Sequence, residues 1–383
     1  MKIAMIGLKQ MFGCEGGIEK TVRHLSFGMA EKGHSVTVYE RGGAGGAGPS
    51  GTGDVPEALR EKIKIVRIPT IPGAAGVPLY SFLAAVRAAL SDCDLVMFHA
   101  SGPCLMLPVA KLGGKKTVAF LHGRDSLRSK WGRFASWYLG QGEKAAATQS
   151  DALLVLTEED GTWARETYGK EAFRVFNGAE APEEDPETPL PDGLVKDGYF
   201  IWSGRISREK GLQYLIPAYR RTRTDKPLLL AGRVSGRNRF FRMLKKAAGE
   251  DPRIRFIGYR TGRELAALYR NAFAFVLPSE MEGMAHSLLE ALACGAPCIL
   301  SDIPENRAVA GGHALYFPSG DTGALAGRMR EWLDRPGARF GPAEGESREI
   351  LRRFSVKESV DRIAGICEAV LAEGRKAGRA GRC

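Results

Sequence analysis

Short apolar runs alternate with segments of helical periodicity along most of this chain. Between the first two runs, Ile18, Val22 and Leu25 recur at helical spacing, and Gly33 follows where a glycine commonly ends a helix. Such alternation predicts βαβ units, in which parallel strands are covered by helices. The strands expected in the first half of the chain are 3–6, 36–39, 63–68, 95–98, 117–121 and 152–156.

A composition break interrupts this pattern. Residues 179–198 are rich in proline and acid and have no apolar period, so we predict an interdomain linker there. The alternation then restarts, which predicts a second α/β domain over 199–354 after a first domain over 1–178. The second series of expected strands is 200–202, 228–230, 254–257, 273–277 and 298–300.

The C-terminal segment 355–383 is expected to be a helix followed by a basic tail. Ser355 and Glu358 have the spacing of a capping box, and apolar residues such as Ile363 and Cys367 share roughly one face. We expect this helix to pack back toward the N-terminal domain. The glycine-rich patch 42–53 is typical of a flexible surface loop.

Length and composition restrict the class of protein. A chain of 383 residues fits two hydrophobic cores better than one. The N-terminus lacks the apolar stretch and cleavage site of a secretory signal, and no run approaches the ~20 apolar residues of a membrane span. The seven cysteines are scattered without zinc-ligand spacing, so we expect reduced thiols in a cytoplasmic protein, soluble or peripheral on the membrane.

A net charge of +11 admits nucleic acid, an anionic membrane surface or phosphorylated substrates as partners. No nucleic-acid-binding module accompanies the charge, so we expect no nucleic acid partner. The segment 127–138 combines basic and aromatic residues. It could form a helix that lies on an anionic membrane or meets a lipid-linked acceptor, or a core-packed helix with a solvated basic side. The basic tail 375–382 could add attraction to such a surface.

Candidate chemistry is expected where strands end, because ligands of open parallel sheets bind beyond the C-terminal ends of the strands. Gly16 and Gly17 stand between the first strand and the first helix. Two glycines allow the backbone to approach a ligand closely, but a tight turn without a ligand would use the same residues. The Gly-x-Gly-x-x-Gly fingerprint of dinucleotide-binding domains is absent.

Two cations follow the strand 200–202. Arg205 lies in the strand-end loop, and Lys210 lies just before the next apolar helix. Together they could clamp a diphosphate, each charge-assisted hydrogen bond contributing ~1.5–3 kcal/mol. The alternative is a pair of solvated basic residues in a loop.

Two carboxylates follow the strand 273–277 in the same way. Glu282 lies in the loop, and Glu290 lies farther on, in the helix that begins around 285–288. The free N–H groups of that helix start suit an anion, and ionised carboxylates accept O–H bonds from hydroxyl-rich ligands. The alternative is that these acids only cap the helix.

The second half of the chain contains two motifs, Gly-Arg…Lys-Gly at 204–211 and Pro-Ser…Glu-Gly…Glu at 278–290. In these two motifs and in their order, it resembles the retaining glycosyltransferases of family 4. The resemblance extends from Met1 to about Ala372 and includes the early Gly-Gly-x-Glu helix. It implies the GT-B fold, an α/β architecture in which two Rossmann-like parallel-sheet domains face each other across a cleft. It also implies retaining transfer of a hexose from a nucleotide-diphosphate sugar to a glycan or lipid-linked acceptor, in cell-surface polysaccharide synthesis and without a metal or other cofactor.

The resemblance implies a role for each matching residue. Arg205 and Lys210 match the cations that hold the donor pyrophosphate. Glu282 matches the acid that reaches the donor sugar, and Glu290 matches the acid that binds the ribose hydroxyls. His122 matches a histidine near the transferred sugar. The expected catalytic residues are therefore His122, Arg205, Lys210 and Glu282, and Glu290 is an expected donor-binding residue. The other expected donor-binding residues are Gly16, Gly17, Gly204, Gly283, Met284, Ala285, Ser287 and Leu288, and Asn177 is the expected hinge between the domains.

Two further features of the sequence bear on this resemblance, one a departure from the family pattern and one a motif of a different family. Met284 and Ala285 stand where many relatives have Phe-Gly, so the donor sugar is not determined. Asp92-Cys93-Asp94 resembles the metal motif of a different glycosyltransferase fold, but it precedes the strand 95–98 and is interpreted as a helix-to-strand turn. A nucleotide-sugar epimerase with the GT-B fold and a non-catalytic sugar-nucleotide-binding protein remain rival interpretations.

Overall fold

The chain divides into two units, and its two ends belong to the same one. Unit 1 comprises Met1–Gly178 and Val356–Cys383, and unit 2 comprises Ala179–Ser355. The predicted glycine-rich loop and much of the predicted linker, residues 43–54 and 180–187, lie outside the described residues. The computed structural model describes residues 1–12, 16–42, 55–71, 73, 75–128, 131–179, 188–191, 193–233, 239–334 and 341–380.

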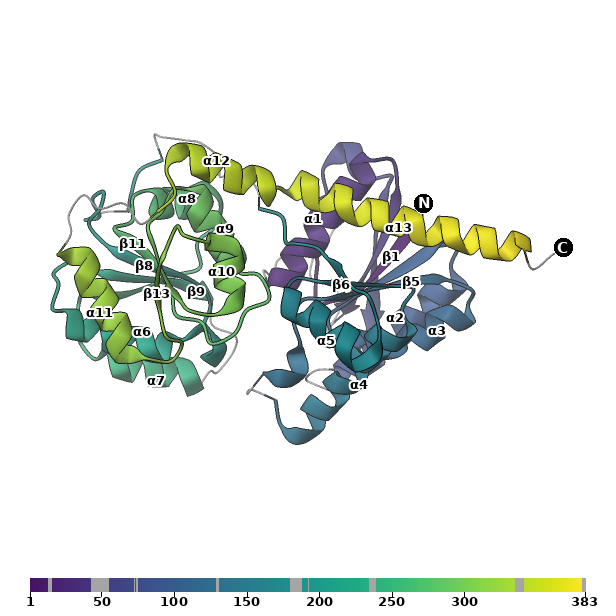
Figure 1. Ribbon diagram of the computed structural model, residues 1–383, viewed down its shortest axis with the longest axis horizontal. Coiled ribbons are helices and arrows are strands. Elements are labelled where there is room, and N and C mark those ends of the chain that lie inside the picture. The colour runs from purple at the N-terminus through teal and green to yellow at the C-terminus, as the bar shows by residue number, and fades with distance from the viewer. Residues whose placement is uncertain are drawn as a thin grey trace. The chain divides into compact units, whose positions relative to one another are not determined.

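The described part of unit 1 contains a seven-stranded sheet in the order β3-β2-β1-β4-β5-β6-β7 (Figure 1). All of its strand pairs are parallel. The strand order reverses between β1 and β4, which is where open sheets of this kind leave a crevice at their C-terminal edge. The strands are β1 (Lys2–Leu8), β2 (Ser35–Gly42), β3 (Ile63–Pro69), β4 (Leu95–His99), β5 (Lys116–Leu121), β6 (Ala152–Val155) and β7 (Phe173–Arg174).

Helices cover both faces of this sheet (Figure 1). On one face, α1 (Gly17–Glu31) packs against α13 (Val356–Ala380), and Val360, Ile363 and Cys367 of α13 are buried. On the other face, small residues such as Ala84 and Ala146 let the helices approach the strands closely. The helices and turns there are α2 (Gly76–Leu90), η3 (Pro103–Met106), α3 (Leu107–Leu112), η4 (Asp125–Leu127), α4 (Arg133–Gln149) and α5 (Glu158–Tyr168), while η2 (Glu57–Leu59) precedes β3.

The described part of unit 2 contains a six-stranded parallel sheet in the order β10-β9-β8-β11-β12-β13. The strand order reverses between β8 and β11. These are the two strands after which the sequence analysis predicted paired cations and paired acids. The strands are β8 (Phe200–Arg205), β9 (Leu228–Arg233), β10 (Ile254–Gly258), β11 (Ala274–Leu277), β12 (Cys298–Ser301) and β13 (Leu315–Phe317).

The core of unit 2 lies between the sheet and the helices α6, α7 and α11 (Figure 1). Its largest side chains include the fully buried Phe200, Trp202 and Tyr219. The remaining helices cover the opposite face. The bounds are η5 (Arg208–Lys210), α6 (Leu212–Thr222), α7 (Arg239–Ala248), α8 (Gly262–Arg270), α9 (His286–Ala293), α10 (Pro304–Ala310), α11 (Thr322–Leu333) and α12 (Glu344–Arg353).

The predicted elements are confirmed, and two short ones were missed. Every strand expected from an apolar run is present, and α1 ends before Gly33, which has a φ of +87° as a glycine stop requires. The missed strands are β7 and β13, with only two and three residues. Runs this short carry no measurable periodicity, so only their pairing to longer strands defines them.

The acidic motif at Asp92 and Asp94 is a turn, as predicted. The Asp94 carboxylate accepts a hydrogen bond of 2.7 Å from the Lys2 backbone N–H, and the Asp92 carboxylate forms an ion pair with the Lys2 ammonium. Both acids therefore lie at the N-terminal edge of β1 and β4, away from the edge where ligands bind. Across the described residues, no cluster of His, Cys, Asp and Glu is arranged to hold a metal ion.

Candidate functional site

The loops that follow β8 and β11 are fastened to each other at the strand-order reversal of unit 2. The Glu280 backbone N–H donates to the Glu209 carbonyl oxygen at 2.9 Å. The Glu280 carboxylate accepts hydrogen bonds from the Tyr214 hydroxyl and the Gln213 amide, both on α6. These contacts hold the two loops in one fixed relation, as a preformed ligand site requires.

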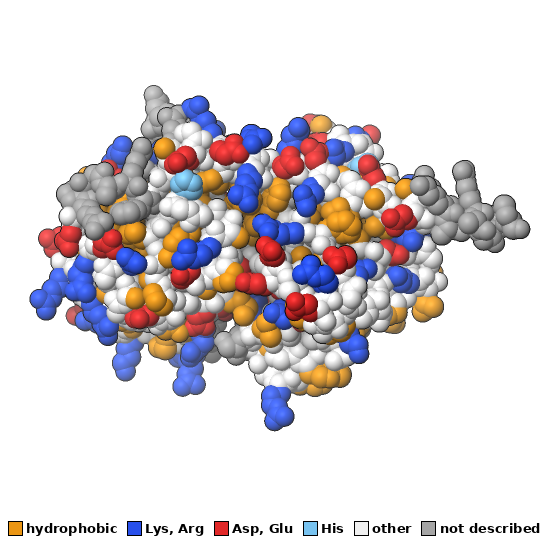
Figure 2. Space-filling view, in the orientation of Figure 1, with side chains coloured by type: hydrophobic (Ala, Val, Ile, Leu, Met, Phe, Trp, Pro, Cys, Tyr) orange, Lys and Arg blue, Asp and Glu red, His pale blue; other side chains and the backbone are white. Residues whose placement is uncertain are grey.

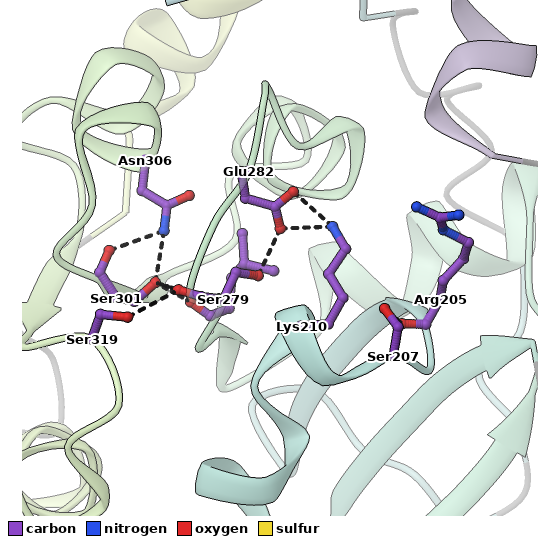
Figure 3. A network of polar contacts seen from close by, with 9 residues as sticks. Arg205, Ser207, Lys210, Ser279, Glu282, Ser301, Asn306 and Ser319 are labelled. Atoms are coloured by element: carbon purple, nitrogen blue, oxygen red, sulfur yellow. Dashed lines mark hydrogen bonds and ion pairs between the residues drawn. The ribbon is translucent and has the colours of Figure 1, made fainter. Parts of the chain in front are cut away.

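A buried ion pair lies between the two loops (Figure 3). The Lys210 ammonium contacts both carboxylate oxygens of Glu282, at 2.6 and 2.8 Å. The side chains are only 14% and 7% exposed, so water screens the pair weakly. An ammonium has three N–H donors, and among the described residues these two bonds use two of them. A predicted cation and a predicted acid, 72 residues apart in the chain, are thus brought into contact.

Ser279 orients the carboxylate and was given no role by the sequence analysis. Its hydroxyl donates to Glu282 Oε1 at 2.6 Å, and its side chain is fully buried. Its carbonyl oxygen accepts the hydroxyl of Ser301 at 2.6 Å, and Ser301 in turn accepts from the Asn306 amide (Figure 3). The signal available in the sequence was position, because Ser279 and Ser301 each lie at the C-terminal end of a strand.

Arg205 lies at the end of β8 with an exposed side chain. Figure 3 shows its guanidinium rising from the same loop region as Lys210, apart from the ion pair. Gly204 before it has a φ of +152°, and a β-carbon there would lie 3.3 Å from the Trp202 ring. Of the two predicted cations, Lys210 is therefore paired with Glu282, and Arg205 is exposed in the same loop region.

The segment after Glu282 leads into α9. Gly283 and Ala285 are buried, Met284 is half-buried, and Ala285 is the N-cap without any side-chain capping bond. The first N–H groups of a helix have no partner inside it, so this end favours an anion. Ser287 is half-buried in the first turn, Leu288 packs in the core, and Glu290 is half-buried one turn later. The structure therefore has a helix start where the sequence predicts one, with Glu282 in the preceding loop and Glu290 inside the helix.

In unit 1, the two predicted glycines open α1. Gly16 is the N-cap in an extended conformation, and Gly17 is the first helical residue. A β-carbon on Gly16 would lie 2.2 Å from a carboxylate oxygen of Glu19, whose other oxygen accepts the Lys9 N–H at 3.3 Å. Glu19 therefore ties the start of α1 to the end of β1, and Gly16 leaves room for it.

His122 follows β5 and lies against a second histidine that the sequence analysis did not select. Its Nε2 is 3.1 Å from Nδ1 of His99, the last residue of β4, and its ring stacks on Phe120 with centroids 4.1 Å apart. His99 is fully buried, and burial lowers its pKa to about 3. At neutral pH His99 is therefore uncharged.

The loops that carry the histidines share one anchor, Glu143 of α4. Its carboxylate accepts the Ser101 hydroxyl at 3.0 Å, just after β4, and both the backbone N–H and the hydroxyl of Ser126, after β5. Burial raises the pKa of Glu143, while these hydrogen bonds oppose the rise. One buried carboxylate thus holds both strand-end loops, a role that no spacing in the sequence indicates.

The predicted hinge residue is buried and bonded. Asn177 is 3% exposed, and its side-chain oxygen accepts the Thr21 hydroxyl of α1 at 3.0 Å. Gly178 follows directly against Val356, where a β-carbon would lie 2.5 Å from the Val356 α-carbon. Asn177 therefore ties the end of the segment Met1–Gly178 to α1, the first helix of unit 1.

The arrangement in unit 2 suits a ligand with negative charge and hydroxyl groups. It combines an exposed guanidinium, an ammonium with a remaining donor, a helix start without a side-chain cap, and one buried and one half-buried carboxylate. Within the part of the chain that the structure describes, no helix is long and apolar enough to span a membrane.

Two family models match the chain, one on each unit. Residues 15–179 match the model described as Glycosyltransferase Family 4, and residues 191–351 match the model described as Glycosyl transferases group 1. The second match contains all the unit 2 residues of this candidate site. The first contains the histidine pair, Glu143 and Asn177.

Similar proteins agree with these matches. The O-antigen chain mannosyltransferase B of Escherichia coli is 29% identical over 144 residues, which span 37% of this chain and 38% of that protein. The phosphatidyl-myo-inositol mannosyltransferase of Mycobacterium leprae is 25% identical, covering 98% of this chain and 99% of that protein. Among solved structures, Anabaena Alr3699/HepE in complex with UDP and glucose superposes with a TM-score of 0.75 at 16% identity, covering 96% and 100% of the two chains.

Proposed function

Because the chain belongs to family 4 of the glycosyltransferases and has the GT-B fold, we propose that it transfers a hexose, with retention of configuration, from a nucleotide-diphosphate sugar to a glycan or lipid-linked acceptor. The observation that carries this proposal is the contact of Lys210 with Glu282 at the strand-order reversal of unit 2. It joins a cation suited to a diphosphate to an acid suited to a sugar hydroxyl.

In this proposal unit 2 binds the donor. Arg205, the remaining N–H of Lys210 and the start of α9 receive the diphosphate, while Glu282 and Glu290 accept hydroxyl groups of the sugar and the ribose. The bond between the anomeric carbon and the diphosphate oxygen breaks, and negative charge grows on that oxygen. Cations already fixed in place stabilise this charge without reorganising, and the reaction needs no metal.

Unit 1 supplies the acceptor side of the reaction. The acceptor hydroxyl oxygen forms the new bond to the anomeric carbon on the face that the diphosphate leaves, and its proton passes to the departing phosphate oxygen. The family resemblance assigns His122 to a histidine that contacts the transferred sugar in relatives, and Gly16 and Gly17 to a loop that faces the donor phosphate there. A complex of HepE with UDP and glucose supports a nucleotide-sugar donor, and the O-antigen mannosyltransferase supports a role in cell-surface polysaccharide synthesis.

We also propose that unit 1 lies on an anionic membrane while it acts on a lipid-linked acceptor. Phe134 and Trp137 of α4 are 77% and 59% exposed with ring centroids 5.8 Å apart, and Leu127 is 53% exposed. Arg133 is exposed beside them. Figure 2 shows hydrophobic side chains next to Lys or Arg on the part of unit 1 that carries the start of α4. Aromatic and basic side chains together suit the boundary of an anionic bilayer. Residues 129 and 130 of the predicted segment lie outside the described residues.

The transfer itself is tested with a panel of nucleotide sugars, each incubated with and without lipid-linked acceptors. We expect nucleotide release and a glycosylated product only when both substrates are present, with the anomeric configuration of the donor kept in the product by NMR. Conversion of the donor without an acceptor would establish an epimerase instead. Donor binding with no product from any pair would establish a non-catalytic binding protein.

The membrane contact is tested by flotation of the full-length protein with vesicles. We expect binding to vesicles that contain anionic phospholipid, and loss of binding in Phe134→Ser/Trp137→Ser. Leu90→Ser is the matched control, because Leu90 is 83% exposed on α2 and away from α4 in sequence. Equal flotation of both variants and the wild type would contradict a contact through α4.

A further inference from the structure

His99 and His122 form a pair of imidazole rings, and only one placement of their protons gives both rings good hydrogen bonding. A neutral imidazole has one N–H and one lone pair, so a contact between two ring nitrogens needs one donor and one acceptor. The nitrogens His99 Nδ1 and His122 Nε2 are 3.1 Å apart. Since burial keeps His99 neutral, the question is which of the two histidines donates.

The other ring nitrogen of His99 decides between the two cases. His99 Nε2 is buried, and it has no hydrogen-bond partner among the described residues. If the proton of His99 were on Nε2, that N–H would be buried without an acceptor, which folded proteins almost never tolerate. If the proton is on Nδ1, only a lone pair remains unpaired, and His99 donates to His122.

The backbone keeps His99 in this position. Its carbonyl oxygen lies so close to β1 that a β-carbon on Gly7 would stand 2.1 Å from it. The next residue, Ala100, has a φ of +71° and donates its N–H to the Phe120 carbonyl oxygen at 3.0 Å. Glu143 holds the loops that follow the two histidines, so the backbone on which both rings are placed is fixed.

We propose that His99 is a positioning residue, which donates its Nδ1–H to Nε2 of His122 and thereby fixes the proton of His122 on Nδ1. His122 then meets any group at its Nδ1 as a hydrogen-bond donor. Such a donor suits a sugar hydroxyl oxygen or a phosphate oxygen, and it cannot act as a base. The expected effect of His99 on turnover rests on the proposed glycosyltransferase function. The positions of the protons on His99 and His122 do not depend on that function.

The proton positions are tested by NMR on the full-length protein labelled with ¹⁵N-histidine. Long-range proton–nitrogen correlations distinguish a protonated ring nitrogen from an unprotonated one, and His122→Asn assigns the signals. We expect His122 to carry its proton on Nδ1 in the wild type and in His99→Asn, whose amide can still donate. A wild-type His122 with its proton on Nε2 would overturn the proposal.

Turnover of matched variants tests the consequence. His99→Leu removes the donor, so we expect kcat to fall by about 10²-fold through mispositioning of His122, while His99→Asn stays within about threefold of the wild type. Phe120→Leu is the control, because it disturbs the ring stacking and leaves the hydrogen bond. If His99→Leu does not fold, the spectra of the wild type and of His99→Asn still decide. Wild-type turnover in His99→Leu with His122 unchanged would overturn the proposal, and no turnover with any donor would refute only the proposed function.

Discussion

Gly211 lies so close to Pro278 that a β-carbon built on it would stand 1.8 Å from the Pro278 carbonyl oxygen. Gly211 also has a φ of +74°, which side chains rarely adopt. It follows Lys210 directly, and Pro278 begins the loop that contains Glu282. The close approach of these two loops, and with it the buried ion pair, therefore requires a glycine at position 211.

We expect Gly211→Ala to separate the loops and to weaken donor binding. The left-handed conformation alone costs about 1–2 kcal/mol for an alanine, and the clash with the carbonyl adds to that. Gly249→Ala is the matched control, because Gly249 has a φ of +63° and open space around its α-carbon. Urea denaturation should show a larger loss of unfolding free energy in Gly211→Ala, together with a raised donor KM. Equal losses in the two variants would contradict the steric argument.

Arg205→Ala should separate catalysis from stability. Arg205 is exposed, so its removal should change the unfolding free energy by less than about 0.5 kcal/mol. Loss of a cation that stabilises the departing diphosphate should nevertheless lower kcat by about 10²–10³-fold. Initial rates at saturating donor and urea denaturation provide the two measurements. Near-normal turnover would remove Arg205 from the diphosphate site.

Lys210→Met and Glu282→Gln should differ in stability although both impair turnover. Lys210→Met leaves a carboxylate that is 7% exposed without its cation, which costs about 3–5 kcal/mol in a fully buried pair. Glu282→Gln keeps an oxygen that can accept from Lys210 and from Ser279, so we expect a smaller loss. Denaturant titrations compare the two variants. A more stable Lys210→Met than Glu282→Gln would contradict this account of the pair.

Ser279→Ala should reduce turnover about tenfold by releasing the Glu282 carboxylate from one fixed donor, since one such hydrogen bond is worth about 1.5 kcal/mol. Ser319→Ala is the control, because within the described part of the chain the Ser319 hydroxyl makes only a long contact of 3.4 Å, with the Ser279 carbonyl oxygen. We expect its kinetics to match the wild type. An unchanged rate in Ser279→Ala would mean that Lys210 alone orients the carboxylate.

The sequence predicted the parts of this molecule that local pattern and strand order determine. Apolar runs predicted every long strand, and the rule that parallel strands end at one edge brought Lys210 and Glu282 to the same site. Spacing could not indicate Ser279, Glu143 or His99. Each of these residues acts through contacts with neighbours that the fold brings beside it, and such contacts exist only once the fold has formed.

The stability of unit 1 should fall in acid because of His99. Its pKa is lowered to about 3 in the folded chain, whereas an unfolded histidine has a pKa of about 6.5. Above pH 6.5 neither state binds the proton, and the His99 contribution is constant. Below pH 6.5 the unfolded state binds the proton first, so the unfolding free energy decreases as pH falls toward 3, by about 1.4 kcal/mol per pH unit.

Burial raises the pKa of Glu143, which acts in the opposite direction, but Glu143 is present in every variant compared. Urea denaturation at pH 7 and pH 5 should therefore show a larger acid loss in the wild type than in His99→Asn, by about 2 kcal/mol. Equal losses of unfolding free energy between pH 7 and pH 5 in the two proteins would mean that His99 takes up a proton in the folded chain near its ordinary pKa.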